Sequence, residues 1–202
     1  MSKTVRMVVC CVALVAVAAP VWAQGKVSIS TVGAPGDNRK PIAIPDYGCA
    51  PGNESVAKTL TDALVFDLTF TGLFRVLPKT NFPAGFTGWT ENVQDASMDA
   101  WKKTGAESVV HAFLKVEGKN LVAECFLLDT ASGSPVVGRR FTTQVDSPRL
   151  ISHKFSEEIV KYVDGTPGIA TSRVFFSAGK PGLKELYAAD YDGYNATRLT
   201  FF

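Results

Sequence analysis

The sequence predicts an α/β (α+β-like) protein, with a mixed sheet of about five strands and three helices, followed by a segment made only of β-strands. Three observations predict this class. Helical and strand-like hydrophobic periods alternate between Lys40 and Gly165. The first two strands of this stretch are separated by a helix, which favours parallel pairing, whereas the later strands follow one another directly. After Gly165 the strand pattern continues without a further helical period.

The first 23 residues have the pattern of a secretory signal peptide. The basic residues Lys3 and Arg6 precede the uncharged apolar run Met7–Ala19, and Ala23 is a small residue at the expected cleavage position before Gln24. The run is shorter than the roughly 20 residues that cross a bilayer. We therefore expect cleavage after Ala23 and release into a bacterial periplasm or the exterior, with a retained membrane anchor as the alternative.

The charge balance argues against a nucleic-acid-binding protein. The sequence has 21 lysines and arginines against 19 acidic residues, and loss of the signal peptide removes two of the positive charges. A nucleic-acid footprint would require a basic stripe or domain. No later apolar run is long enough to cross a membrane. Cys49 and Cys125 remain after cleavage, and the sequence leaves open whether they form a disulfide or stay as two thiols.

A short arm is expected at the start of the mature chain. Val27, Ile29 and Thr31 alternate with polar residues, as in a strand, and turn-forming residues follow them. We expect residues 24–39 to form an arm and a hinge. The arm either adds a strand to the sheet of another protein or pairs back onto its own domain.

The elements between residues 40 and 165 follow from hydrophobic spacing and from capping residues. Asn53 and Gly72 should bound the first long helix, and Ser147 and Gly165 the last one. The expected helices are 54–71, 96–104 and 148–163. The expected strands are 40–48, 73–78, 107–116, 121–130 and 135–145, with a two-residue turn at 118–119.

We find no pattern that predicts catalysis, a cofactor or a metal. His111 lies in an expected strand among apolar residues, which is typical of a packed or half-exposed histidine. His153 lies away from the apolar stripe of its helix, so we expect it to be exposed. The histidines and cysteines lack the spacing of metal ligands. The glycine-rich turns lack the following helix of a phosphate site, and Ser134 and Ser177 lack a nucleophile elbow.

The β-only segment carries the most specific motif of the chain. Residues 166–172 are expected to form a linker, and the stretch "ELYAADYDGYNATRLT" a strand, a tight turn and a second strand. Asp192-Gly193 suits the positive φ of a tight hairpin, and Asn195 tolerates similar backbone angles.

This stretch resembles the first blade of the β-propeller in the TolB family of periplasmic translocation proteins. The matching residues are Asp190, Asp192, Gly193 and Asn195. Three upstream stretches resemble the same family, so that the resemblance runs from about residue 25 to about residue 200. They are "VSIS…RKPIAIPDY", "VAKTLTDALVFDLTFTGLFRVL" and "AWKKTGAESVVHAFLKVEGKNLVAECFLLDTASG".

The resemblance implies a division of the chain into four parts. These are a signal peptide (1–23), an arm and hinge similar to a TolA-binding segment (24–39), an α/β domain (40–165), and a linker with a truncated first propeller blade (166–202).

The resemblance also implies a non-enzymatic scaffold of the Tol–Pal system, which supports protein translocation, envelope integrity and cell division. The arm would dock the C-terminal domain of TolA, and a complete propeller would dock the lipoprotein Pal at the outer membrane. The implied arm residues are Gly25, Lys26, Val27, Ser28, Ile29, Ser30, Thr31 and Val32.

Two other functions are compatible with the same residues. The chain could be a free-standing periplasmic binding or activator module, or the accessory domain of a propeller-bearing hydrolase. An isolated hairpin is marginally stable in water. We therefore expect residues 173–202 to be mobile or protease-sensitive unless their apolar side chains pack on the α/β domain.

Overall fold

The main sheet is mixed, as the order of its elements predicts. The computed structural model describes residues 37–93 and 97–201, so the predicted signal peptide and arm lie outside the described residues. All elements below belong to the unit Asn38–Phe202. The strands of the main sheet are β1 (Lys40–Ala43), β2 (Gly48–Cys49), β3 (Phe74–Val76), β4 (Ser108–Glu117), β5 (Asn120–Asp129) and β6 (Pro135–Gln144).

The strand order confirms the expected parallel and antiparallel halves. The order is β3-β1-β4-β5-β6, and β2 also pairs with β4. Strand β1 runs parallel to β3 and β4, whereas β4, β5 and β6 form an antiparallel meander. The single strand expected over residues 40–48 is split into β1 and β2. Pro45 lies in the gap, where a proline has no N–H to donate to a strand ladder.

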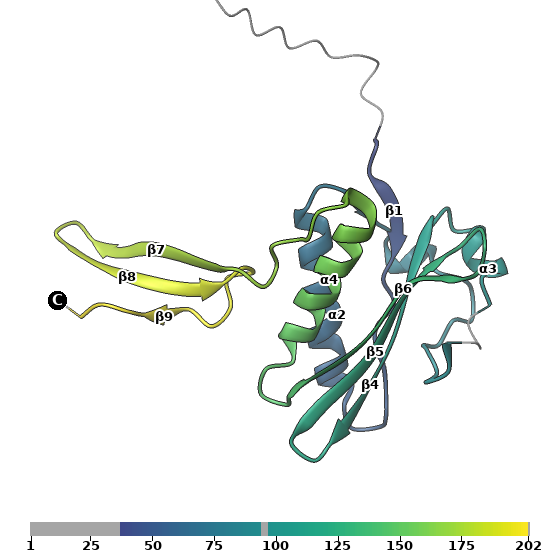
Figure 1. Ribbon diagram of the computed structural model, residues 1–202, viewed down its shortest axis with the longest axis horizontal. Helices are drawn as coiled ribbons and strands as arrows, with labels where there is room; N and C mark the ends of the chain where they lie inside the picture. Colours follow the sequence, from purple (N-terminus) through teal and green to yellow (C-terminus); the bar gives the residue numbers. More distant parts are fainter. Residues whose placement is uncertain (1–36, 94–96, 202) are drawn as a thin grey trace, which may run out of the picture. The chain divides into compact units, whose positions relative to one another are not determined.

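Two long helices cover one face of this sheet (Figure 1). They are α2 (Glu54–Phe70) and α4 (Arg149–Asp164). Leu60 and Leu64 of α2 and Phe155 of α4 are fully buried against Val110 and Leu121 of the sheet. This layer is the main hydrophobic core, and its burial is the chief source of stability for both helices.

The helix ends are mostly where the capping residues predict them. Gly72 and Gly165 have φ angles of 71° and 82°, the left-handed conformation expected after a helix. Asn53 occupies the N-cap position of α2, but its amide lies 3.4 Å from the carbonyl oxygen of Ala50 and caps no helical N–H. Instead, the carboxylate of Glu54 accepts the Gly52 N–H at 3.0 Å.

The other face of the sheet is covered by a short helix and an aromatic loop. The helix α3 (Asp99–Lys102) is shorter than the expected span of 96–104. Trp101 of α3 is 2% exposed, with ring centroids 5.1 Å from both Phe82 and Phe86. His111 is buried on this face, 4.7 Å from the Trp89 ring. It is therefore packed, which is one of the two environments expected for it.

The two cysteines of the domain are separate thiols. Cys49 on β2 pairs with Leu114 on β4, whereas Cys125 lies on β5, beyond β4. Two strand spacings, about 10 Å, exceed the roughly 7 Å limit for the Cα atoms of a disulfide. Burial raises the pKa of Cys125 to about 12, so this thiol stays protonated at neutral pH.

The last described residues form a second, three-stranded antiparallel sheet (Figure 1). Its strands are β7 (Arg173–Lys180), β8 (Leu183–Asp190) and β9 (Thr197–Arg198). The carboxylate of Glu185 joins β8 to the following segment through Arg198 and through the Thr200 hydroxyl, the latter at 2.5 Å. The exposed apolar side chains of this sheet are Val174, Phe175, Phe176, Leu183, Leu186, Leu199 and Phe201. The expected mobility of this segment stays a prediction.

Within residues 37–93 and 97–201, no helix is both long and apolar enough to cross a membrane.

Candidate functional site

The loop Asp190–Asn195 has the tight geometry that its motif predicts. The carboxylate of Asp190 accepts a hydrogen bond from the Asn195 amide at 2.5 Å. The Gly193 N–H donates to the Asp190 carbonyl at 2.9 Å. Gly193 has φ 84° and Asn195 has φ 54°, so both adopt the left-handed angles expected from the sequence. The four motif residues are thus brought together in one turn.

Asp192 has a second role that a turn does not require. Its Oδ1 accepts the Tyr194 N–H at 3.1 Å, which stabilises the loop itself. Its Oδ2 points away from the loop toward Arg149, in the first turn of α4. This oxygen accepts a hydrogen bond from Arg149 Nε at 2.7 Å and another from Nη2. The Asp192 side chain is 1% exposed. The Arg149 guanidinium also lies 3.7 Å from the centre of the Tyr194 ring.

His153 lies one turn further along α4 and is held between two carboxylates. Its Nε2 is 3.3 Å from Asp192 Oδ2, and its Nδ1 is 2.8 Å from Oδ2 of Asp67 on α2. The residue is only 4% exposed, so the expectation that His153 is exposed is wrong. The physical reason is that α4 buries two sides. One side packs against the sheet through Phe155, and the other faces α2 and the loop through His153 and Ser156.

We call the set Asp67, Arg149, His153 and Asp192 the junction network. Ser156 extends it, because its hydroxyl lies 3.0 Å from Asp67 Oδ2. The network links α2, α4 and the loop after β8, three segments that are far apart in the chain. Arg149 is 14% exposed, and the other three side chains are more deeply buried.

The pKa of His153 is raised within this network. Burial, the largest single influence, lowers the pKa. The hydrogen bond to Asp67, the negative charge of Asp67 and that of Asp192 raise it, and Arg149 opposes them more weakly. The raising contributions prevail, so the folded protein favours the imidazolium form beyond the pH at which a free histidine would lose its proton.

The junction network and Ser156 provide the residue types of a Ser-His-Asp triad, but their hydrogen-bond pattern differs from that of a triad. In a triad, the histidine Nε2 faces the serine hydroxyl. Here Nε2 faces Asp192, and the Ser156 hydroxyl lies beside Asp67 and 2.8 Å from the His153 carbonyl oxygen. Ser156 is 1% exposed. This arrangement presents no activated nucleophile to a substrate. Across the described ranges, no cluster of three or more His, Cys, Asp or Glu residues is placed to hold a metal ion.

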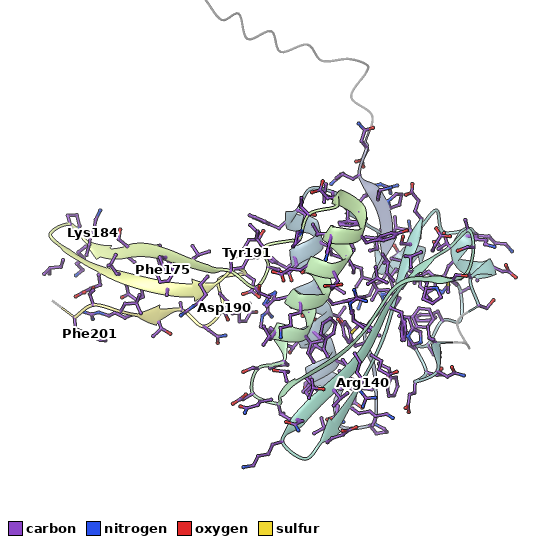
Figure 2. All side chains as sticks on the ribbon, in the orientation of Figure 1. Arg140, Phe175, Lys184, Asp190, Tyr191 and Phe201 are labelled. Carbon is purple, nitrogen blue, oxygen red and sulfur yellow. The ribbon has the colours of Figure 1, made fainter. Side chains whose placement is uncertain are left out.

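Aromatic and linker contacts support the same junction. Tyr191 packs edge-on against Phe70 of α2, with ring centroids 5.4 Å apart. Figure 2 shows Tyr191 and Asp190 at the end of the hairpin beside the helices. In the linker, the Thr171 N–H donates to the Glu157 carboxylate of α4 at 2.8 Å.

Two cavities border this loop. One, of about 410 Å³, is lined by Asp67, Phe70, Ser156 and Tyr191 among others. The other, of about 440 Å³, is lined by Arg149, His153, Asp190, Tyr194 and Asn195 among others.

Comparison with known families decides the identity of the domain. Residues 27–136 match the family described as the TolB amino-terminal domain. The chain belongs to the TolB family. This assignment confirms the resemblance inferred from the sequence motifs, and the matched residues include the whole of α2 and the sheet through β5.

Individual TolB proteins agree with this assignment. The chain is 30% identical to the Tol-Pal system protein TolB of Geobacter sulfurreducens over 72% of its own length and 33% of the relative. It is 33% identical to that of Syntrophotalea carbinolica over 72% of the chain and 34% of the relative. The chain therefore spans about one third of the length of these TolB proteins.

A solved TolB structure shows the same fold. The crystal structure of TolB from Acinetobacter baumannii superposes with a TM-score of 0.66 at 21% identity, over 79% of this chain and 38% of that one.

Sequence reasoning missed the junction network, although one signal was available. Asp67 lies on the buried side of α2, four and three positions after the buried residues Ala63 and Leu64. A charged residue on a buried helix face requires a partner. That rule indicates that Asp67 is paired, but it does not identify His153, which comes from the other helix.

Proposed function

We propose that the chain is a non-enzymatic interaction scaffold of a Tol–Pal system in the bacterial periplasm. The match of residues 27–136 to the TolB amino-terminal domain carries this proposal. The relatives from Geobacter sulfurreducens and Syntrophotalea carbinolica bear the name Tol-Pal system protein TolB. The signal-peptide pattern and the propeller-like motif in residues 190–195 support the same compartment and family.

The proposed contact with TolA is made by the arm, residues Gly25–Val32. These residues lie outside the described part of the structure. The support comes from their alternating pattern, in which Val27, Ile29 and Thr31 share one side of a strand. Such a strand can add to the edge of a partner sheet, with backbone hydrogen bonds for affinity and alternate side chains for specificity.

Replacing Ile29 with aspartate should weaken binding of the TolA C-terminal domain about tenfold or more. The reason is that a charge would replace an apolar anchor on the buried side of the added strand. Isothermal titration of the full chain against the TolA domain of the same organism measures the change. Ser30→Asp is the matched control, since Ser30 lies on the opposite side of the strand and should have a smaller effect. Unchanged affinity after deletion of residues 24–32 would contradict the arm as the docking segment.

Docking of Pal is proposed only for a complete propeller. In this proposal, the three-stranded sheet of β7, β8 and β9 belongs to the first blade of such a propeller. The resemblance of "ELYAADYDGYNATRLT" to a first blade supports this assignment for β8 and β9, and β7 pairs antiparallel with β8. Hydrolysis of peptide or ester substrates by the purified chain would overturn the non-enzymatic part of the proposal.

A further inference from the structure

One carboxylate fastens the hairpin loop to the α/β domain. Oδ2 of Asp192 accepts hydrogen bonds from Arg149 and lies 3.3 Å from His153 Nε2, while Oδ1 stays with the Tyr194 N–H of its own loop. The Asp192 side chain is almost completely excluded from solvent. A charge held in this way is strongly coupled to the charges around it, because solvent screens buried pairs poorly.

The protonation state of His153 decides whether the positive and negative charges of the junction network are equal in number. With an imidazolium, two positive groups, His153 and Arg149, face two carboxylates, Asp67 and Asp192. Nδ1 then donates to Asp67 at 2.8 Å, while Nε2 lies 3.3 Å from Asp192 Oδ2 as an ion-pair contact without hydrogen-bond geometry. In a neutral imidazole with its proton on Nδ1, the Nε2 lone pair faces the Asp192 carboxylate in place of a positive charge. The buried network would then carry an excess negative charge.

The groups that face His153 come from each element packed around it. Helix α2 contributes Asp67, the loop contributes Asp192, and α4 itself contributes Arg149. The linker, residues 166–172, has no ionisable side chain. The nearby tyrosines, Tyr47 and Tyr191, have pKa values raised by burial, so they stay neutral when histidine titrates. His153 is thus the group in this set that changes charge near neutral pH.

We propose that the loop Asp190–Asn195 is a pH-dependent latch, which protonated His153 holds against the α/β domain and which loosens when His153 loses its proton. The latch is an intramolecular docking contact between the propeller-like hairpin and helices α2 and α4. It is separate from the proposed TolA contact, because the residues that form it, Asp67, Arg149, His153 and Asp192, all lie outside the arm.

The direction of the pH effect follows from the raised pKa of His153. A group whose folded pKa is higher than its unfolded value stabilises the folded contact fully below the unfolded pKa, about 6.5 for histidine. That contribution is lost as the pH rises through the folded pKa. The latch should therefore be tight at pH 6 and looser at pH 8.5.

Hydrogen exchange of the full chain tests the latch at these two pH values. After correction for the intrinsic exchange rate, the Tyr194 and Gly193 amides should be less protected at pH 8.5 than at pH 6. The Leu186 amide, bonded to Thr200 inside the hairpin at 2.9 Å, should keep its protection. This internal reference separates opening of the latch from unfolding of the hairpin.

Asp192→Asn and Asp190→Asn form a matched pair of variants in the same loop. Asparagine at 192 keeps an oxygen for the Tyr194 N–H but removes the charge that faces Arg149 and His153. This variant should show weak loop protection at both pH values, and its His153 pKa, followed by NMR, should fall. Asp190→Asn changes a carboxylate that bonds to Asn195 within the turn, so its pH response should persist.

Each measurement has a result that overturns the latch. Loop protection that is equal at pH 6 and pH 8.5 in the wild-type chain would do so. An Asp192→Asn variant that keeps the wild-type pH response would do so as well. The chain contains two histidines, His111 and His153. Substitution of one of them is therefore enough to assign the two imidazole signals in the NMR spectrum.

Discussion

Replacing Asp67 with alanine should lower the free energy of unfolding by about 3–5 kcal/mol, the cost of removing one partner from a buried ion pair. Asp67 is 1% exposed, and its Oδ2 lies within hydrogen-bonding distance of His153 Nδ1 and the Ser156 hydroxyl. Its loss leaves both groups without this acceptor in the α2–α4 interface. Urea unfolding followed by circular dichroism at pH 6 measures the change.

Asp62→Ala is the matched control on the same helix. Asp62 is well exposed and pairs with Lys58 one turn earlier, at 2.7 Å. Exposed pairs of this kind contribute about 0.5 kcal/mol or less. A loss below about 1 kcal/mol for Asp67→Ala, similar to that of the control, would show that the junction network contributes little to the stability of the domain.

The secondary structure could be predicted because its signals are local. Gly72 and Gly165 mark helix ends through backbone angles that other residues disfavour. The turn at Gly118 and the alternating hydrophobic pattern around it predict the β4–β5 hairpin. The register confirms it, because Ser108 pairs with Asp129 at one end and Glu117 with Asn120 at the turn. In such cases the residue that carries the signal is also the residue that adopts the conformation.

The junction network could not be predicted in the same way, because each member has its partner on another element. The apolar stripe of α4, including Ile151 and Phe155, identifies the side that faces the sheet. It contains no information about the side that faces α2. His153 lies on that second side, so the apolar stripe alone predicts an exposed side chain where the structure has a buried one. Buried polar contacts between distant helices leave no periodic trace in the sequence.

The six residues Asp190–Asn195 include both kinds of residue: some whose role depends on local contacts, and one whose role depends on a contact with a distant element. Asp190, Gly193 and Asn195 build the turn by local contacts, and their roles follow from the sequence. Asp192 shares in the turn but also carries the long-range contact to α4. A sequence pattern typical of a tight turn therefore also contains the residue that attaches the turn to the domain, and only the structure separates the two roles.

Replacing Trp101 with alanine should destabilise the domain by about 3–5 kcal/mol, the range for removing a large buried aromatic side chain. Trp101 is 2% exposed and packs against Phe82, Phe86 and Trp89, with centroid distances of 5.1, 5.1 and 5.8 Å. Helix α3 has only four residues, too few to be stable by itself, so this packing is what holds it on the sheet.

Near-UV circular dichroism and urea unfolding together test this role of Trp101. The near-UV signal of the aromatic cluster should collapse, while the pH response of the loop Asp190–Asn195 should persist, because the cluster and the junction network lie on opposite faces of the sheet. Trp101→Phe should recover part of the lost stability, since phenylalanine keeps an apolar ring at the site. A Trp101→Ala variant with wild-type stability would mean that α3 and the aromatic loop are held to the sheet by other contacts.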